Sequence, residues 1–235
     1  MSGEELKKKA ESYLGELCAH IPSRSVGSQG NRDATGFFAW QMESFGFQVE
    51  CPQFACMDWN QKGASLSVNG NPIEAQVSPY SLGGRFEAPL AVVSSLEGLE
   101  AIEARSSILL VRGALTREQL MPKSFTFYNP DEHKRIIRLL EEKKPRAIIA
   151  ATSHNPEMAG AVYPFPLIED GDFDIPSVYL TEEAGVQLAK HAGEHVALDI
   201  RAQRLPAQGC NVIARKGKEP QKRVVCLAHV LSESA

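Results

Sequence analysis

The sequence predicts an α/β fold in two parts, and three observations lead to this prediction. Amphipathic helical patterns alternate with short apolar strand patterns, as is typical of α/β domains. The segment from about residue 55 to 204 differs in pattern from both ends of the chain. A chain of 235 residues is long enough for one large or two small domains. We therefore expect one domain from residues 1–54 and 205–235, interrupted by an inserted module at 55–204.

The first part of the chain predicts two amphipathic helices and a strand. Apolar side chains recur every three or four positions from Leu6 to Leu17, and again through a second segment that ends before Gly46. Ser28 or Asn31 can cap the start of this second helix, and Gly46 stands where a left-handed residue closes one. Residues 47–50 then predict a strand.

The middle segment predicts short strands and helices. An Asn-Gly pair at 69–70 marks a hairpin. Asn129 as cap and Pro130 at the first position predict the start of one helix, and Thr181 caps another. Residues 203–209 are expected to be a linker. The predicted strands lie at residues 65–68, 73–77, 90–93, 108–111, 147–150, 176–180 and 195–200.

Two further strands are predicted at 211–214 and 224–228, on either side of a charged turn. The second strand presents His229 at its carboxyl end. A buried strand that delivers a histidine at this end is a common way to build a metal or catalytic site. We therefore single out His229 as the candidate metal ligand, and we predict no catalytic residue and no other cofactor-binding residue. The alternative, which we favour for this chain, is an exposed histidine at a strand end that binds no metal.

Charge and composition exclude several classes of protein. The formal net charge of −4 offers no basic surface for nucleic acid. No run of about 18 apolar residues is present to span a membrane. The amino-terminal segment is charged and lacks the apolar core of a signal peptide, so we expect a cytoplasmic protein with no nucleic-acid or membrane partner. Nucleotide-binding glycine motifs and the G-x-S-x-G serine motif are absent from the sequence.

The cysteines are odd in number and form no C-x-x-C pair, which argues against both a disulfide framework and a thiolate zinc site. We expect them to be reduced and mostly buried. Cys51 and Cys56 are expected to be separate thiols rather than a redox pair. The five positions are 18, 51, 56, 210 and 226.

Three stretches, taken in order, resemble a known family. They are RSVGSQGNRDA at 24–34, the strand and helix order of the middle module, and CNVIA at 210–214 followed by RVVCLAH at 223–229. Together they resemble the co-catalytic zinc exopeptidases of the leucyl aminopeptidase and glutamate carboxypeptidase type. The resemblance covers nearly the whole chain, but only the amino-terminal part of such a protein. It implies part of an aminopeptidase-type mixed-sheet α/β domain with an inserted, protease-associated-like α+β module.

The resemblance also implies a reaction, the hydrolysis of a peptide bond at a chain end by a water that two zinc ions activate. His229 matches the first zinc-binding histidine of the family. Leu231 stands where the family usually has an aspartate that orients this histidine, and the remaining ligands are not found in the sequence. We therefore expect this chain to be a truncated member of the family. The complete family site would bind zinc and a peptide substrate. This chain alone is expected to bind no zinc stably and to be inactive.

Several alternatives remain open from the sequence. The chain is alternatively a non-catalytic module that binds peptides or another protein, and self-association through an incomplete sheet is expected. Residues 27–31 fit either an anion contact at a helix start or a simple capped turn, which we favour. The four carboxylates in 169–174 fit either a weak calcium loop or a solvated acidic loop, again the favoured interpretation. The other histidines show no metal-ligand spacing: His20, His133, His154, His191 and His195.

Overall fold

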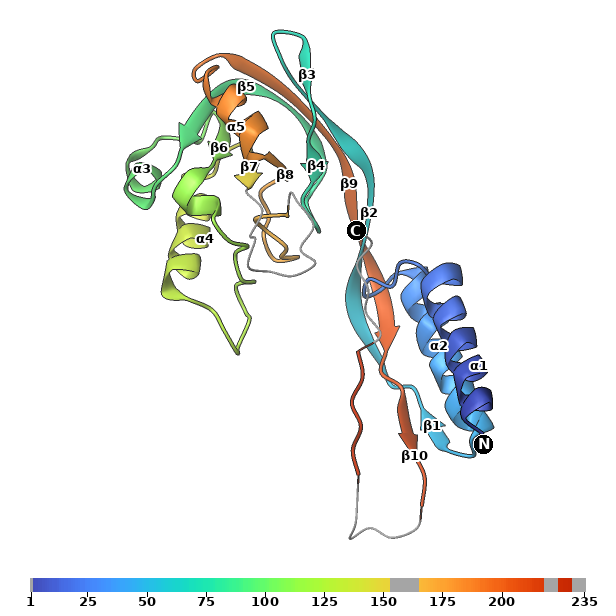
Figure 1. Cartoon of the computed structure of the whole chain (residues 1–235). Coiled ribbons are helices and arrows are strands. Elements are labelled where there is room, and N and C mark those ends of the chain that lie inside the picture. The colour runs from blue at the N-terminus through green and yellow to red at the C-terminus, as the bar shows by residue number, and fades with distance from the viewer. Residues whose placement is uncertain (1, 153–164, 218–223, 230–235) are drawn as a thin grey trace. The chain divides into compact units, whose positions relative to one another are not determined.

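The computed structural model describes residues 2–152, 165–217 and 224–229 (Figure 1). The chain separates into unit 1, residues 1–58 with 205–235, and unit 2, residues 59–204. Its strands form a mixed sheet of order β3-β2-β9-β5-β6-β7-β8-β4 and a two-stranded sheet, β1-β10. This confirms the predicted α/β class with a mixed sheet. No helix in the described ranges is long and apolar enough to cross a membrane.

Unit 1 contains two helices joined by a π-helical turn and a small antiparallel ladder. Its elements are α1 (Gly3–Leu14), η1 (Gly15–His20), α2 (Gln29–Ser44), β1 (Gln48–Glu50), β10 (Ile213–Arg215) and the outer ends of β2 and β9. The Ser28 hydroxyl accepts a hydrogen bond from the Asn31 backbone N–H at 3.1 Å, so Ser28 caps α2. Gly46 has the expected left-handed conformation, with φ at 74°.

Unit 1 buries little apolar surface of its own. Among its described residues, only Ile21 and Ala34 are buried apolar side chains. The two helices meet through the Tyr13 hydroxyl, which donates to the Gln41 side chain at 2.8 Å. Larger apolar side chains are exposed, including Leu14 at 61% and Trp40 at 62%. The described residues of unit 1 therefore do not form the apolar core that usually stabilises a domain.

Unit 2 contains the parallel strands and most of the helices. Its elements are the main parts of β2 (Gln53–Val68) and β9 (His195–Cys210), with β3 (Asn71–Ile73), β4 (Gln76–Val77), β5 (Gly84–Val93), α3 (Leu96–Ala101), β6 (Ile108–Val111), η2 (Gly113–Thr116), α4 (Asp131–Lys143), β7 (Ala147–Thr152), β8 (Ser177–Thr181) and α5 (Glu182–Ala189). Strands β5 to β8 run parallel, whereas β9 pairs with β5 in the antiparallel sense.

The parallel strands lie between two apolar clusters, one on each face. Every residue of β6 and β7 is buried. One cluster includes Ile149 and Ala151 with Leu188 of α5, and the other includes Ile148 with Leu140 of α4. Figure 1 shows α5 on one side of these strands and α3 and α4 on the other. This arrangement is typical of parallel sheets, whose two faces are both covered.

The Asn-Gly hairpin is confirmed by the structure. Asn69 and Gly70 connect β2 to β3, and both have positive φ, at 52° and 78°. That combination defines a turn whose twist matches antiparallel strands. The second predicted strand of this segment, 73–77, is in fact divided, because β4 leaves the hairpin and pairs with β8 through Gln76 and Tyr179.

The linker predicted at 203–209 is wrong, because β9 continues as a strand through Cys210. This part of β9 contains Pro206, although proline removes a backbone donor. However, β5 pairs with β9 only as far as Ile200. Beyond Ile200, β5 no longer pairs with β9. A proline in this part of β9 therefore removes no hydrogen bond to β5.

Two other predictions also need correction. The α4 helix begins at Asp131, with Pro130 rather than Asn129 at the cap position, because the Asn129 amide donates instead to the carbonyls of Pro122 and Lys123. Residues 224–229 form no strand and are exposed. A strand needs a partner backbone, and among the described strands β10 pairs with β1 and none pairs with this segment.

The contact between α5 and β7 predicts an effect of mutation at Gly185. A Cβ atom at this position would lie 2.2 Å from the Ala151 Cβ. Gly185→Ala should therefore lower the free energy of unfolding, because overpacking costs about 1–3 kcal/mol. This cost exceeds the roughly 1 kcal/mol by which alanine is favoured over glycine in a helix. Urea unfolding followed by circular dichroism measures the change.

The matched control is Gly36→Ala in α2, where a Cβ meets nothing within 4 Å. This variant should be neutral or slightly stabilised, by up to about 1 kcal/mol. Equal stability of Gly185→Ala and wild type would contradict the close packing of α5 on β7.

Candidate functional site

The structure describes His229, the predicted metal ligand, as an exposed residue in an irregular segment. No three His, Cys, Asp or Glu side chains in the described part of the chain lie close enough together to hold a metal ion. A catalytic zinc ion takes three protein ligands and a water. The described residues around His229 therefore do not fit a zinc centre.

Three of the other histidines have side-chain or backbone partners, whereas His195 is exposed at the start of β9. The buried His133 side chain accepts a hydrogen bond at Nδ1 from the Met121 backbone N–H at 3.2 Å, and its Nε2 lies 3.5 Å from Glu118. His20 pairs with Glu16, and His191 with Glu194. His154 lies outside the described residues. His133 therefore anchors a loop to the start of α4.

The loop at 24–31 is a tightly closed turn. Arg24 donates to the carbonyl oxygens of Leu17 and Ile21, and Arg32 donates to the carbonyl of Gly27 at 2.6 Å. Gly27 has φ of +84°, and a Cβ there would lie 3.1 Å from the Cys56 Sγ. Together with the Ser28 cap, these contacts support the interpretation as a capped turn.

The cysteines are less buried than expected. Cys18, Cys51 and Cys226 are exposed, and Cys56 and Cys210 are half-buried. The prediction of mostly buried thiols is therefore wrong. All five cysteines belong to unit 1, whose described residues include few buried side chains, and Cys226 lies in the exposed segment 224–229. The small core of unit 1 is the physical reason.

The acidic segment 169–174 is held by basic and backbone donors of unit 2. The Asp170 carboxylate accepts from the Lys123 backbone N–H at 2.9 Å, and Asp174 pairs with Arg204 at 2.7 Å. The Lys123 ammonium donates to Glu141 at 2.8 Å and also to the Asp172 carbonyl. These contacts give the segment an internal structural role.

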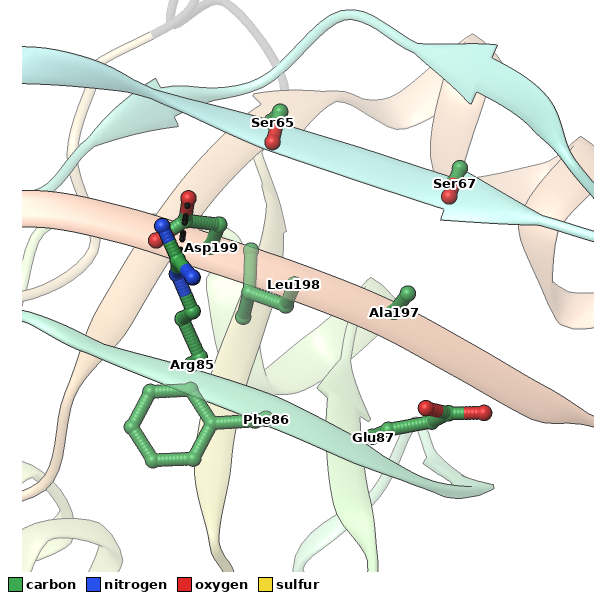
Figure 2. Close-up of a pocket in the computed structure, with 8 residues that line it drawn as sticks. All are labelled: Ser65, Ser67, Arg85, Phe86, Glu87, Ala197, Leu198 and Asp199. Carbon is green, nitrogen blue, oxygen red and sulfur yellow. Dashed lines mark ion pairs between the residues drawn. The ribbon is translucent and has the colours of Figure 1, made fainter.

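An open hollow of about 400 Å³ lies on the sheet surface of unit 2, across β2, β9 and β5 (Figure 2). Arg85 and Asp199 are directly opposite each other on β5 and β9 and form an ion pair at 3.4 Å. The Arg85 side chain is 87% exposed, so this pair adds little stability. The hollow is lined by Ser65, Ser67, Arg85, Phe86, Glu87, Ala197, Leu198 and Asp199.

This hollow can bind but lacks the usual catalytic groups. Its lining residues include hydroxyl, guanidinium and carboxylate groups, but no histidine or cysteine. Such an open, mixed-charge surface suits a polar, extended ligand. Sequence reasoning missed these residues. The alternation of polar and apolar residues around Arg85 and Glu87 marks an open strand face, but it does not reveal which strands lie side by side.

Comparisons with known proteins place the fold. Neither a protein-family model nor a curated protein matches the sequence. Solved structures of zinc aminopeptidases do match. An aminopeptidase from Aneurinibacillus sp. strain AM-1 is 18% identical with a TM-score of 0.61, covering 90% of this chain and 49% of its own. The zinc aminopeptidase BSAP from Bacillus subtilis is 21% identical with a TM-score of 0.59, covering 92% and 48%.

A peptidase M28 precursor from Shewanella amazonensis SB2B is 19% identical with a TM-score of 0.58, covering 90% of this chain and 52% of its own. The chain thus spans about half the length of these structures. At these identities the likeness establishes a shared fold. The chain shares the fold of about half of each of these structures.

The contacts of Lys123 predict how its loop responds to mutation. The hydrogen bond to Glu141 raises the pKa of Lys123 above its usual value, so the anchor is complete at neutral pH and is lost only as the pH rises above about 10.4. Lys123→Met should release residues 121–130 and speed chymotrypsin cleavage after the exposed Phe125 and Phe127 several-fold.

The control for this experiment is Lys134→Met, which removes an ion pair with Asp131 that is exposed on both sides. Its cleavage rate should equal that of the wild type. If Lys123→Met is also cleaved at the wild-type rate, Lys123 does not anchor the loop.

Proposed function

We propose that the chain is part of a zinc-dependent aminopeptidase, in which unit 1 contributes to the catalytic α/β domain and unit 2 is an inserted, protease-associated-like module. The observation that carries this proposal is the shared fold, over about 90% of the chain, with an aminopeptidase, a zinc aminopeptidase and a peptidase M28 precursor. The order of the units along the chain supports it, because unit 2 interrupts unit 1. The reaction is hydrolysis of a peptide bond at a chain end.

In this proposal His229 is one zinc ligand. A neutral imidazole suits zinc, and zinc in such enzymes lowers the pKa of a bound water and polarises the scissile carbonyl. Because the described residues do not make a zinc centre, the other ligands and the general base come from residues other than those described here. We assign no catalytic step to residues of this chain.

The exposed apolar surface of unit 1 also supports this proposal. Leu14, Phe38, Trp40 and Phe54 are all more than a third exposed, while only two apolar side chains among the described residues of unit 1 are buried. Large apolar side chains that are exposed in this number can contact another part of a protein. In a complete aminopeptidase domain, further strands and helices would cover such surface.

The alternative is a non-catalytic module that binds an extended peptide or another protein at the hollow on the unit 2 sheet. The mixed charges of Arg85, Glu87 and Asp199 favour a polar ligand. The likeness to aminopeptidases favours the first function, and the two functions differ in whether the protein hydrolyses peptides.

A gene and activity experiment tests the proposed function. The DNA beyond codon 235 should encode further Asp, Glu and His residues in one of its three frames. The protein with that continuation should release nitroaniline from aminoacyl-nitroanilides in a zinc-dependent manner. His229→Ala should lower its kcat/KM by at least about 100-fold, because removing groups that support a metal already costs 10–100-fold.

His195→Ala serves as the control, since His195 is an exposed histidine at the start of β9 and should leave activity unchanged. Residues 1–235 alone should show no turnover with added zinc. Zinc-dependent turnover by residues 1–235 alone would contradict the proposal that the other zinc ligands lie outside this chain. Full activity of His229→Ala would contradict the assignment of His229, and a gene that encodes no further ligands would favour the binding module.

A further inference from the structure

Two cysteines from distant parts of the sequence meet in unit 1. Cys51 lies between β1 and β2, and Cys210 is the last residue of β9. The two side chains are close enough that Cys210 contributes to a raised pKa of the Cys51 thiol. Both are free thiols in this structure. Sequence analysis considered Cys51 only beside Cys56, so this partner is new.

The strand register explains why these two residues meet. In the antiparallel pair of β1 and β10, Glu50 lies opposite Ile213. The same register continues beyond β1, where the Asn211 N–H donates to the Pro52 carbonyl at 3.2 Å. Residues 51 and 210 are then diagonal neighbours with side chains on one face of the ladder.

The surroundings leave this pair accessible. Cys51 is exposed, and Cys210 is half-buried, with its Sγ 3.6 Å from the Thr35 Oγ1. Burial, followed by the neighbouring Cys210, raises the pKa of the Cys51 thiol. At neutral pH the pair is therefore stored mainly as thiols rather than as reactive thiolates. Cys56, by contrast, has its Sγ directed at the Gly27 turn.

We propose that Cys51 and Cys210 are a modification site, at which a low-molecular-weight disulfide oxidises the two thiols to an intramolecular disulfide. One thiol loses its proton and attacks a sulfur of the small disulfide, whose S–S bond breaks to release one small thiol. The second protein thiol then loses its proton and attacks the mixed disulfide, releasing the other small thiol. Two electrons pass from the cysteine pair to the small disulfide, and excess small thiol reverses the reaction.

The local backbone gives the pair room to adjust. A disulfide requires Cα atoms about 4.4–6.8 Å apart and a specific torsion angle. Residues 51–52 and 211–212 lie outside the regular strands, at the interruption between β1 and β2 and between β9 and β10. Because diagonal neighbours lie about 7–8 Å apart, forming the bond requires the backbone to shift at this interruption so that the two Cα atoms come closer.

The bond would have a defined consequence for the chain. Cys51 lies just before the chain enters unit 2, and Cys210 lies just after it returns. A disulfide there closes every residue from Pro52 to Gly209 into one covalent loop. Long closed loops restrict the unfolded chain most, so oxidation should raise the melting temperature.

Peptide mapping of the whole chain tests the proposal. The protein is incubated with oxidised glutathione, its remaining thiols are alkylated, and it is digested without reductant. We expect one main crosslinked peptide pair that contains Cys51 and Cys210, lighter by the two hydrogens lost. The oxidised protein should melt several degrees higher than the reduced protein, and dithiothreitol should remove both effects.

Variants keep the outcome decisive. A Cys18→Ser, Cys56→Ser, Cys226→Ser triple variant retains only the pair and should form the crosslink to the same extent as the wild type. Cys51→Ser and Cys210→Ser should each stop at a mixed disulfide with glutathione and show no rise in melting temperature. A crosslink between Cys51 and Cys56, crosslinks only between chains, or stable mixed disulfides on both Cys51 and Cys210 would each overturn the proposal. None of these results depends on peptidase activity.

Discussion

Burial of the parallel strands β6 and β7 along their whole length is the constraint on which unit 2 depends. A strand that is buried on both faces carries apolar side chains on both faces, so other elements must cover each face of the sheet. The α5 helix supplies them on one face through Leu188, and α4 supplies them on the other through Leu140. The close approach of Gly185 to Ala151 shows how tightly one of these layers is packed.

Unit 1 meets the same constraint only in part. Its helices have good caps, such as the capping box of Ser2 and Glu5, and a specific contact between Tyr13 and Gln41. Caps and single hydrogen bonds contribute about 1 kcal/mol each, whereas burial of apolar side chains contributes most of the stability of a domain. Because unit 1 buries so few such side chains, its stability depends on surface that this chain leaves exposed. Half of an aminopeptidase domain would have this character.

Much of the fold could be predicted from the sequence, because local signals determine it. The helix periodicity, the Asn-Gly hairpin, the Gly46 cap and the apolar run at 108–111 all specify local structure directly. The prediction of a linker at 203–209 was wrong because a strand can contain Pro206 where β5 does not pair with it. The end of the pairing with β5 is known only from the structure. The prediction of a strand at 224–228 was wrong because an apolar run forms a strand only where another strand pairs with it.

Less of the candidate site could be predicted. The sequence singles out His229 through its position after an apolar run. In the structure His229 is exposed, and no group of metal-ligating side chains is present among the described residues. The hollow around Arg85 and Asp199 and the meeting of Cys51 with Cys210 depend on strand register between distant segments. Local patterns carry no information about such register, so these features could not be found before the fold was known.

Hydrogen exchange, resolved by mass spectrometry on residues 1–235, tests the central claim most directly. We propose that unit 1 is part of a larger domain, whereas unit 2 has a core of its own. This account predicts that backbone amides of β6 and β7 exchange most slowly, whereas those of α1 and α2 exchange orders of magnitude faster through local opening. Equal, strong protection in α1, α2, β6 and β7 would show that unit 1 is stable without further chain and would contradict the account.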